Sequence, residues 1–326
     1  MNAITQLDDA LIEQAIAHYE VGALQRYWVA ANGIENSNYF VETYDAGRMR
    51  RFVLTIHEQQ ANAGDAYVAM MGTLEKAGFP VAPPLRNANG QPVDDVAGKP
   101  ATLQWCLPGK HVQNPTTRQV CALARFAARM HLAMAETPLE LPQYPRDAGW
   151  LADAVQRTLP TISLVDGQLL RHCCDGVSAM LARQDTRSLP RGMIHGDLFR
   201  DNVLFNERGL SGVLDFHHAS CGYWVYDLAV IANDWCTDAS GMLDPDRTIA
   251  MLRAYSQIRP LQVEELWFFS SFTLYAALAF WLSRLVVRVP VDGQAPVRLK
   301  NPDEFKAITQ QHLAHPLFID SRLILD

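Results

Sequence analysis

A change in the spacing of apolar residues near position 107 constrains the fold of this chain more than any other feature. Before it, residues 39–44 and 51–57 are rich in β-branched and aromatic side chains, and a turn at residues 45–47 joins them into a predicted hairpin. After it, apolar side chains recur with a helical period. The first helical run contains Val120, Leu123, Ala127, Met130 and Met134. The sequence therefore predicts a small sheet followed by a mainly helical region.

Further breaks in the pattern give the boundaries. A third strand is predicted at residues 101–106, with helices at residues 7–19 and 66–77. Residues 107–109 include a proline and a glycine, which end strand pairing and fix a bend. Because 326 residues exceed what one hydrophobic core usually organises, we expect an α+β fold of two lobes. These are a small antiparallel-sheet lobe, residues 1–106, and a mainly helical lobe, residues 107–326.

Composition argues against several classes of protein. The chain has 28 Lys and Arg residues against 35 Asp and Glu, a net charge of −7, and no basic run, so nucleic acid is not expected as its main partner. It opens without a basic, apolar leader, and its most apolar stretch, residues 267–282, is shorter than the ~20 residues of a membrane span. We therefore expect a buried helix there and no membrane partner. Six cysteines without C-x-x-C spacing predict free thiols and a cytoplasmic protein.

One polar cluster carries the predicted chemistry. Asp197 and Asn202 lie five residues apart in a loop that begins at His195, and Asp215 follows a predicted two-stranded ribbon, residues 203–214. Magnesium takes oxygen ligands and is held by one or two carboxylates plus substrate phosphates, so Asn202 and Asp215 suffice as protein ligands. Asp197 then remains to orient a hydroxyl group and accept its proton, as phosphoryl transfer requires. His195 is expected to brace the loop by hydrogen bonding.

The motif His195-Gly-Asp-Leu-x-x-x-Asn202 resembles the catalytic loop of protein-kinase-like enzymes, and Asp215-Phe216 resembles the metal-binding pair that follows it. The His-Gly-Asp form is similar to the aminoglycoside phosphotransferase and choline kinase branch. Within that branch, further strings resemble the homoserine kinases: residues 35–39, 52–55, 197–205, 226–229, 233–236 and 280–284. The resemblance implies a two-lobed protein-kinase-like fold, ATP and Mg²⁺ as cofactors, and phosphorylation of L-homoserine, a small-molecule substrate, on its side-chain hydroxyl for threonine biosynthesis.

The resemblance also implies where ATP binds. Asn36, Ser37 and Asn38 precede a predicted strand and would donate hydrogen bonds to the phosphates; alone, they read as an ordinary polar turn. Backbone groups of residues 103–109, Gln104 and Cys106 among them, would face the adenine edge.

One position departs from the protein-kinase pattern. Thr55 stands in the strand that carries an ATP-binding lysine in protein kinases, although homoserine kinases of this type share the threonine. The phosphate charge must then be met by magnesium, by backbone N–H groups or by an arginine. The candidates are Arg50, Arg51 and Arg200.

Homoserine is a zwitterion, so its site needs a cation for the carboxylate and a carboxylate for the ammonium. Arg200 and Arg284 are candidates for the first, and Asp234 and Asp201 for the second. For each residue the alternative is an ordinary salt bridge. Asp227 directly precedes an apolar helical run and is predicted as the N-cap of that helix.

Two other functions stay open. The same fold and mechanism serve other acceptors, namely an aminoglycoside, choline, hydroxylysine or a protein serine or threonine. Thr55 also leaves room for a non-catalytic, nucleotide-binding regulator. A zinc site at His217, His218 and Cys221 is not expected, because neighbouring strand residues point to opposite faces and no second pair completes a tetrahedral site.

Overall fold

The structure is a computed structural model that describes residues 4–30, 36–58, 64–287 and 300–325. The chain divides into two compact units, residues 1–109 with 211–217, and residues 110–210 with 218–326. The division falls after Gly109 rather than after residue 106. It also assigns residues 211–217 to the first unit, whereas the sequence placed them in the helical lobe.

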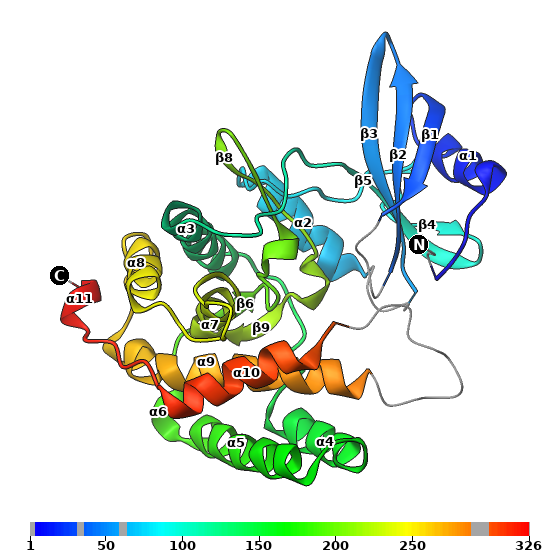
Figure 1. The fold of residues 1–326 in the computed structure, drawn as a ribbon. Helices are drawn as coiled ribbons and strands as arrows, with labels where there is room; N and C mark the ends of the chain where they lie inside the picture. Colours follow the sequence, from blue (N-terminus) through cyan, green and yellow to red (C-terminus); the bar gives the residue numbers. More distant parts are fainter. Residues whose placement is uncertain (1–3, 31–35, 59–63, 288–299, 326) are drawn as a thin grey trace. The chain divides into compact units, whose positions relative to one another are not determined.

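The first unit is built on a five-stranded antiparallel sheet of order β1-β2-β3-β5-β4. Helix α1 lies beside this sheet (Figure 1), and a buried core that includes Ile12, Tyr39 and Leu54 fills the space between them. The elements are α1 (Asp9–Ala17), β1 (Ala23–Val29), β2 (Ser37–Asp45), β3 (Arg48–Ile56), α2 (Asp65–Lys76), β4 (Asp94–Val96) and β5 (Lys99–Trp105).

The predicted hairpin and third strand are confirmed as β2, β3 and β5, and the two predicted helices as α1 and α2. The tight turn between β2 and β3 depends on Ala46 and Gly47, which both have positive φ angles. Strands β1 and β4 were not predicted. β1 lies at the edge of the sheet and no residue in it is fully buried, so it lacks the apolar alternation of a core strand.

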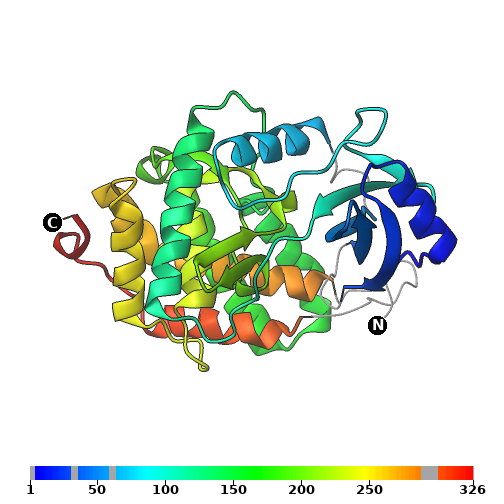
Figure 2. The same ribbon diagram turned by 90° about the horizontal axis from the view of Figure 1, so that it is seen from above.

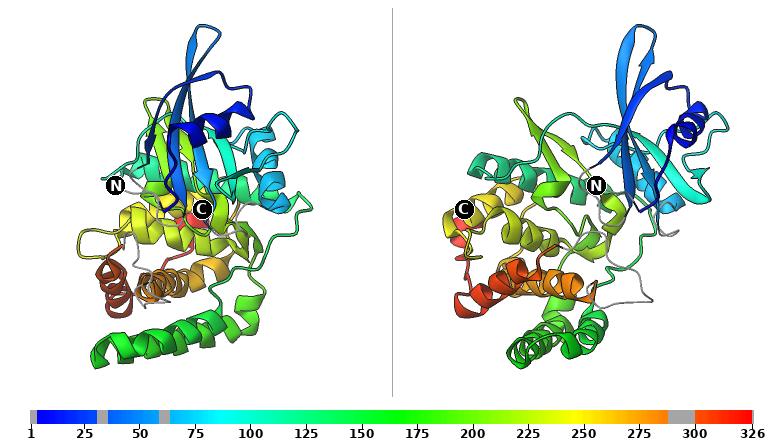
Figure 3. Two further views of the ribbon diagram at one scale, coloured as in Figure 1. Left: turned by 90° about the vertical axis from the view of Figure 1, so that its right-hand side faces the viewer. Right: turned by 45° about the vertical axis from the view of Figure 1, so that its right-hand side comes forward.

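The second unit is mainly helical, as expected. Its helices are α3 (Thr117–Ala135), α4 (Ala148–Thr158), α5 (Leu164–Ala182), α6 (Gln184–Arg187), α7 (Trp224–Trp235), α8 (Pro245–Ser256), α9 (Val263–Val286), α10 (Pro302–Ala314) and α11 (Arg322–Leu325). α3 packs beside α8 (Figure 2), and α10 runs alongside α9 (Figure 3). α3 begins at a capping box in which Thr116 and Gln119 satisfy each other's backbone N–H groups.

Helix α9 is the core helix of this unit. It contacts α4, α5, α7 and α10, and Phe269, Phe272 and Trp281 on it are almost fully buried. Among the described helices it alone is long and apolar enough to cross a membrane, yet 67% of its most apolar window is buried inside the protein. The predicted buried helix is therefore confirmed, although it is longer than the apolar stretch suggested. Trp267, the first residue of the apolar stretch, is 68% exposed, so the expectation of burial is wrong at this residue.

Two short antiparallel strand pairs interrupt the helices. β6 (Arg191–Ile194) pairs with β9 (Ser220–Tyr223), and β7 (Val203–Asn206) pairs with β8 (Gly209–Val213) as the predicted ribbon. The six cysteines are free thiols, as expected. Within the described residues no three His, Cys, Asp or Glu side chains gather to hold a metal ion.

Candidate active site

The loop that joins β6 to β7 carries the predicted catalytic motif. It leaves the strand at His195, turns at Gly196 with a φ of +77°, and ends in a 3-10 helix, Arg200–Asn202. A Cβ atom on Gly196 would lie 3.3 Å from the carbonyl oxygen of His218. The positive φ and this close approach both favour glycine. Asp197 therefore follows the end of β6 directly after a tight turn at Gly196.

Asp197 and Asn202 meet within this loop. The Asn202 Nδ2 group donates to the Asp197 carboxylate Oδ2 over 2.7 Å and to the Asp197 backbone oxygen over 2.8 Å. These bonds turn the amide nitrogen toward Asp197 and the amide oxygen the other way. The predicted base and one predicted metal ligand are therefore side by side.

Asp227, the predicted N-cap, has another role. Helix α7 begins at Trp224 with Tyr223 as its N-cap, so the capping prediction is wrong. The Asp227 carboxylate is fully buried and accepts the backbone N–H groups of His195 and Gly196, each over 2.8 Å. Charge-assisted bonds of this kind are stronger than neutral ones. Asp227 therefore fixes the start of the catalytic loop to helix α7.

A second buried side chain holds Asp227 from behind. His131 on α3 lies 3.0 Å from the Asp227 carboxylate through Nε2 and 2.7 Å from the Tyr255 hydroxyl through Nδ1. Its ring also stacks on Trp224, with the ring planes 5° apart. His195 contributes as predicted, because its Nδ1 accepts the Asp197 N–H over 3.2 Å. The loop is thus braced from α3, α7 and α8.

Asp215 lies in the segment that belongs to the first unit. It has a φ of +59°, a left-handed conformation that is uncommon for residues other than glycine, and its side chain is exposed. The segment is held to the first unit by Val213 N–H, which donates to Pro80 O, and by His217, whose ring stacks on Tyr67. Such a strained and exposed carboxylate is typical of a functional position.

The predicted phosphate-binding residues are engaged inside the first unit. The Ser37 hydroxyl is buried and donates to Glu58 over 2.6 Å, and the Asn36 amide oxygen accepts the Glu58 N–H over 3.3 Å. Asn38 accepts a bond from Thr55 over 2.7 Å. Glu35, the first residue of the matching string 35–39, lies outside the described residues. Thr55, which stands where protein kinases have a lysine, therefore links β3 to β2 through its bond to Asn38.

The other predicted nucleotide contacts also have partners in the first unit. The Gln104 side chain donates to the Ala82 carbonyl over 2.7 Å, and the Cys106 N–H donates to the Arg51 carbonyl over 3.0 Å. Among the candidate arginines, Arg50 pairs with Asp45 at 2.7 Å and Arg51 with Glu42 at 2.5 Å. Both arginines thus serve the β2–β3 hairpin.

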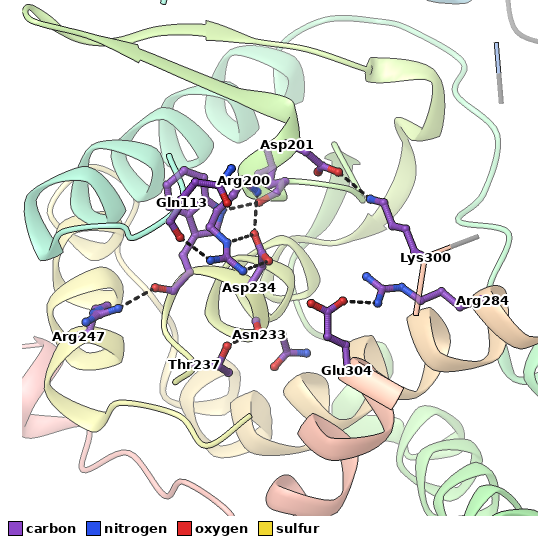
Figure 4. A network of polar contacts seen from close by, with 12 residues as sticks. Gln113, Arg200, Asp201, Asn233, Asp234, Thr237, Arg247, Arg284, Lys300 and Glu304 are labelled. Atoms are coloured by element: carbon purple, nitrogen blue, oxygen red, sulfur yellow. Dashed lines mark hydrogen bonds and ion pairs between the residues drawn. The ribbon is translucent and has the colours of Figure 1, made fainter. Parts of the chain in front are cut away.

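Arg200 and Asp234 bind each other (Figure 4). Arg200 donates to Asp234 through its backbone N–H over 2.6 Å and through Nε and one terminal nitrogen over 3.1 Å each. Its other terminal nitrogen donates to the Gln113 carbonyl. The structure therefore uses both residues in a bidentate pair that fixes the 3-10 turn on α7.

Two further cations lie near this turn (Figure 4). Arg284 is 11% exposed, donates to Glu304 and to the Asn301 carbonyl, and lies over a phenylalanine ring. Lys300 donates to Asp201 over 2.7 Å, and both side chains are about two-fifths exposed, at 41% and 43%. Sequence reasoning did not identify Lys300, because no local pattern connects it to a loop 99 residues away.

Beside the loop, the second unit also has a pocket of about 240 Å³. Its lining includes Tyr144, Tyr226, Tyr275 and Arg191. The hydroxyl groups of Tyr144 and Tyr226 are 2.5 Å apart, and burial raises the pKa of both. Arg191 donates to a glutamine oxygen over 3.0 Å. These tyrosines were not predicted, since they come from three separate elements.

The chain is similar to known phosphotransferases over most of its length. Residues 29–261 match the phosphotransferase enzyme family. A homoserine kinase from Pseudomonas aeruginosa is 34% identical over 307 residues, which cover 94% of this chain and 95% of that protein. A homoserine kinase from Polaromonas naphthalenivorans is 36% identical over 307 residues, covering 92% and 94%.

Solved structures share the fold at low sequence identity. An aminopropanol kinase associated with a microcompartment has a TM-score of 0.70 at 16% identity, covering 94% of each chain. An amicoumacin kinase, solved with AMP-PNP and Ca²⁺, has a TM-score of 0.67 at 15% identity, covering 94% of this chain and 92% of its own. A choline kinase from Cryptosporidium parvum has a TM-score of 0.67 at 12% identity, with 94% and 95% covered. The predicted two-lobed, protein-kinase-like α+β fold is confirmed.

Proposed function

This chain belongs to the phosphotransferase enzyme family, and from that premise we propose that it transfers the γ-phosphoryl group of ATP to the side-chain hydroxyl of L-homoserine. The observation that carries the proposal is the braced loop with Asp197 and Asn202 in contact, on a chain about 35% identical to homoserine kinases along nearly its whole length. The product, O-phospho-L-homoserine, belongs to threonine biosynthesis, which takes place in the cytoplasm.

Asp197 is the proposed base. Its carboxylate would accept a hydrogen bond from the acceptor hydroxyl, orient that oxygen in line with the γ-phosphorus atom, and receive the proton as the new P–O bond forms. The bond from Asn202 and the backbone bond from Asp197 N–H to His195 hold this carboxylate in one orientation. Positioning of this kind supplies much of the rate enhancement in phosphoryl transfer.

The donor set fits magnesium. Asn202 and Asp215 offer one amide oxygen and one carboxylate, and Mg²⁺ is usually held by one or two such groups together with waters and substrate phosphates. The Asn202 amide nitrogen donates to Asp197, so the amide oxygen is the atom that would act as the ligand. When bound, the ion would offset charge on the ATP phosphates. Asn36, Asn38 and the backbone near Gln104 and Cys106 are the proposed nucleotide contacts.

We expect Asp215→Ala to weaken nucleotide binding only when magnesium is present. The substitution removes the one carboxylate among the two proposed ligands, so ATP affinity in Mg²⁺ should fall about 10-fold or more, a loss typical of a charged contact. ATP affinity in EDTA should be unchanged. Calorimetric titration of both proteins in both buffers is the measurement, and equal Mg²⁺ dependence in the two proteins would refute the assignment of Asp215.

A substrate panel tests the proposed function directly. ADP release from Mg-ATP would be measured with L-homoserine, L-serine, choline, hydroxylysine and an aminoglycoside, with Asp197→Asn as the blank. Selective turnover of L-homoserine is the expected result. Turnover of another compound would keep the mechanism and reject the substrate. ATP binding without turnover of any acceptor would instead support the regulator that Thr55 left open.

A further inference from the structure

Three ion pairs lie near the end of the catalytic loop (Figure 4). They differ in the number of hydrogen bonds that each cation makes and in the exposed fraction of its side chains. All three nitrogens of the Arg200 guanidinium have acceptors, and both oxygens of its partner Asp234 have donors. Asp234 is also only 15% exposed. Arg200 itself is 36% exposed, but an incoming carboxylate would have to displace three hydrogen bonds to Asp234 at once and leave that largely buried carboxylate without its counter-charge, which is a costly exchange.

Arg284 is largely buried and has several contacts of its own. It is 11% exposed, and its guanidinium lies 4.5 Å from the centre of the Phe305 ring while one nitrogen binds both Glu304 and a backbone carbonyl. These contacts come from the N-cap residue and the first turn of α10. This arginine therefore links the C-terminal end of α9 to the start of α10. Little of its surface is accessible to a ligand.

Lys300 differs from both arginines. One hydrogen bond of 2.7 Å joins it to Asp201, and both side chains are about two-fifths exposed. An exposed pair of this type contributes little stability, so its partners exchange at low cost. The Lys300 ammonium also lies 5.5 Å from the centre of the Phe199 ring. Both Phe199 and Asp201 belong to the loop segment between Asp197 and Asn202.

The charge of Lys300 is favoured by its surroundings. Burial opposes the charged form, but Asp201 and then Asp197 raise the pKa of the Lys300 ammonium. Lys300 is therefore a cation, which is the form that binds a carboxylate.

We propose that Lys300 and Asp201 form the head-group site for the amino-acid substrate, Lys300 binding its α-carboxylate and Asp201 its α-ammonium. The inference rests on the proposed function and names the residues that recognise the substrate. An α-amino acid carries its two opposite charges on one carbon, so it presents them side by side. Such a ligand replaces the single Lys300–Asp201 bond by two charge-assisted bonds and leaves neither residue without a counter-charge.

Substrate analogues that lack one charge test the two residues separately. In Lys300→Met, kcat/KM for L-homoserine should fall about 10- to 100-fold, the range of one charged hydrogen bond. The same substitution should not lower kcat/KM for 3-amino-1-propanol, which has no carboxylate. Asp201→Asn should lower kcat/KM for L-homoserine as well. It should not lower kcat/KM for 4-hydroxybutanoate, which has no ammonium. For an analogue that does not turn over, its inhibition constant against homoserine replaces kcat/KM.

Matched variants separate recognition from folding. Lys306→Met removes a lysine six positions along the chain that pairs with Asp166 at 2.6 Å, and it should leave kcat/KM for homoserine unchanged. Lys300→Arg should restore most of the activity, since it keeps the cation. Equal losses on homoserine and 3-amino-1-propanol would show a structural role and overturn the proposal, as would no loss on either.

The two proposals fail in different ways. If the wild-type protein does not phosphorylate L-homoserine, the proposed function is wrong and the head-group site is wrong with it. If homoserine is turned over but Lys300→Met and Asp201→Asn behave as the wild type with every analogue, only the head-group site is wrong. The carboxylate would then be bound elsewhere, for example by Arg191 in the tyrosine pocket.

Discussion

Asp197→Asn should lower kcat about 10²- to 10⁴-fold, the range usually contributed by general acid–base catalysis. The substitution removes the group that accepts the hydroxyl proton. It preserves the shape of the loop, because an asparagine oxygen can still accept the bond that Asn202 donates over 2.7 Å. The measurement is steady-state turnover of L-homoserine at saturating Mg-ATP, together with calorimetric ATP affinity.

ATP affinity is the internal control for this variant, and it should stay close to the wild-type value, because neither proposed metal ligand is changed. A kcat within a factor of about three of the wild type would contradict the assignment of Asp197 as the base. A fall in kcat accompanied by an equal loss of ATP affinity would instead point to a damaged nucleotide site.

Asp227→Ala should lower the free energy of unfolding by about 3–5 kcal/mol, the cost of removing one partner from a buried charged network. The substitution leaves the N–H groups of His195 and Gly196 without their acceptor and exposes the buried face of His131 to an empty space. Turnover should fall as well, since the start of the catalytic loop is no longer fixed. Urea denaturation of wild type and variant is the measurement.

Asp8→Ala is the matched control, because Asp8 is an ordinary helix N-cap that accepts one bond from Leu11 N–H. Loss of such a cap costs about 0.5–2 kcal/mol. If Asp227→Ala destabilised the protein no more than Asp8→Ala does, the proposed brace would be wrong. A large loss of stability with unchanged kcat in the remaining folded protein would show that Asp227 stabilises the fold but is not needed to position the catalytic loop.

The parts of the fold that were predictable are those whose signal is local. The hairpin of β2 and β3, and the helix α9, carry their period or turn within a single stretch of sequence. Strand β1 was missed because an edge strand needs no buried face, and its residues 25 and 26 are polar or charged. The exposure of Trp267 was not expected, since a stretch with apolar residues around most of the helix does not identify the face left in solvent.

The candidate site shows the same division. Asp197, Asn202 and Asp215 were proposed from their spacing and from the family resemblance, whereas the contacts of Asp227 join atoms 31 and 32 residues apart. Arg200 and Asp234 were correctly noted as charged residues near the loop, but only the structure shows that they pair with each other. Which charges neutralise one another is a property of tertiary packing. For the same reason the exposed pair of Lys300 and Asp201 had no signature in the sequence.

The first unit is not a continuous stretch of the chain, and this limits how the protein can be divided experimentally. A fragment ending at Gly109 would lack residues 211–217, and with them Asp215, the Val213 bond to Pro80, and the Ser211 hydroxyl bond to Pro108. Pro80 and Pro108 would lose these partners, and one proposed magnesium ligand would be missing. Weak nucleotide binding by such a fragment would therefore say nothing about the intact protein, and any dissection by expression or limited proteolysis must keep the full chain or restore this seven-residue segment.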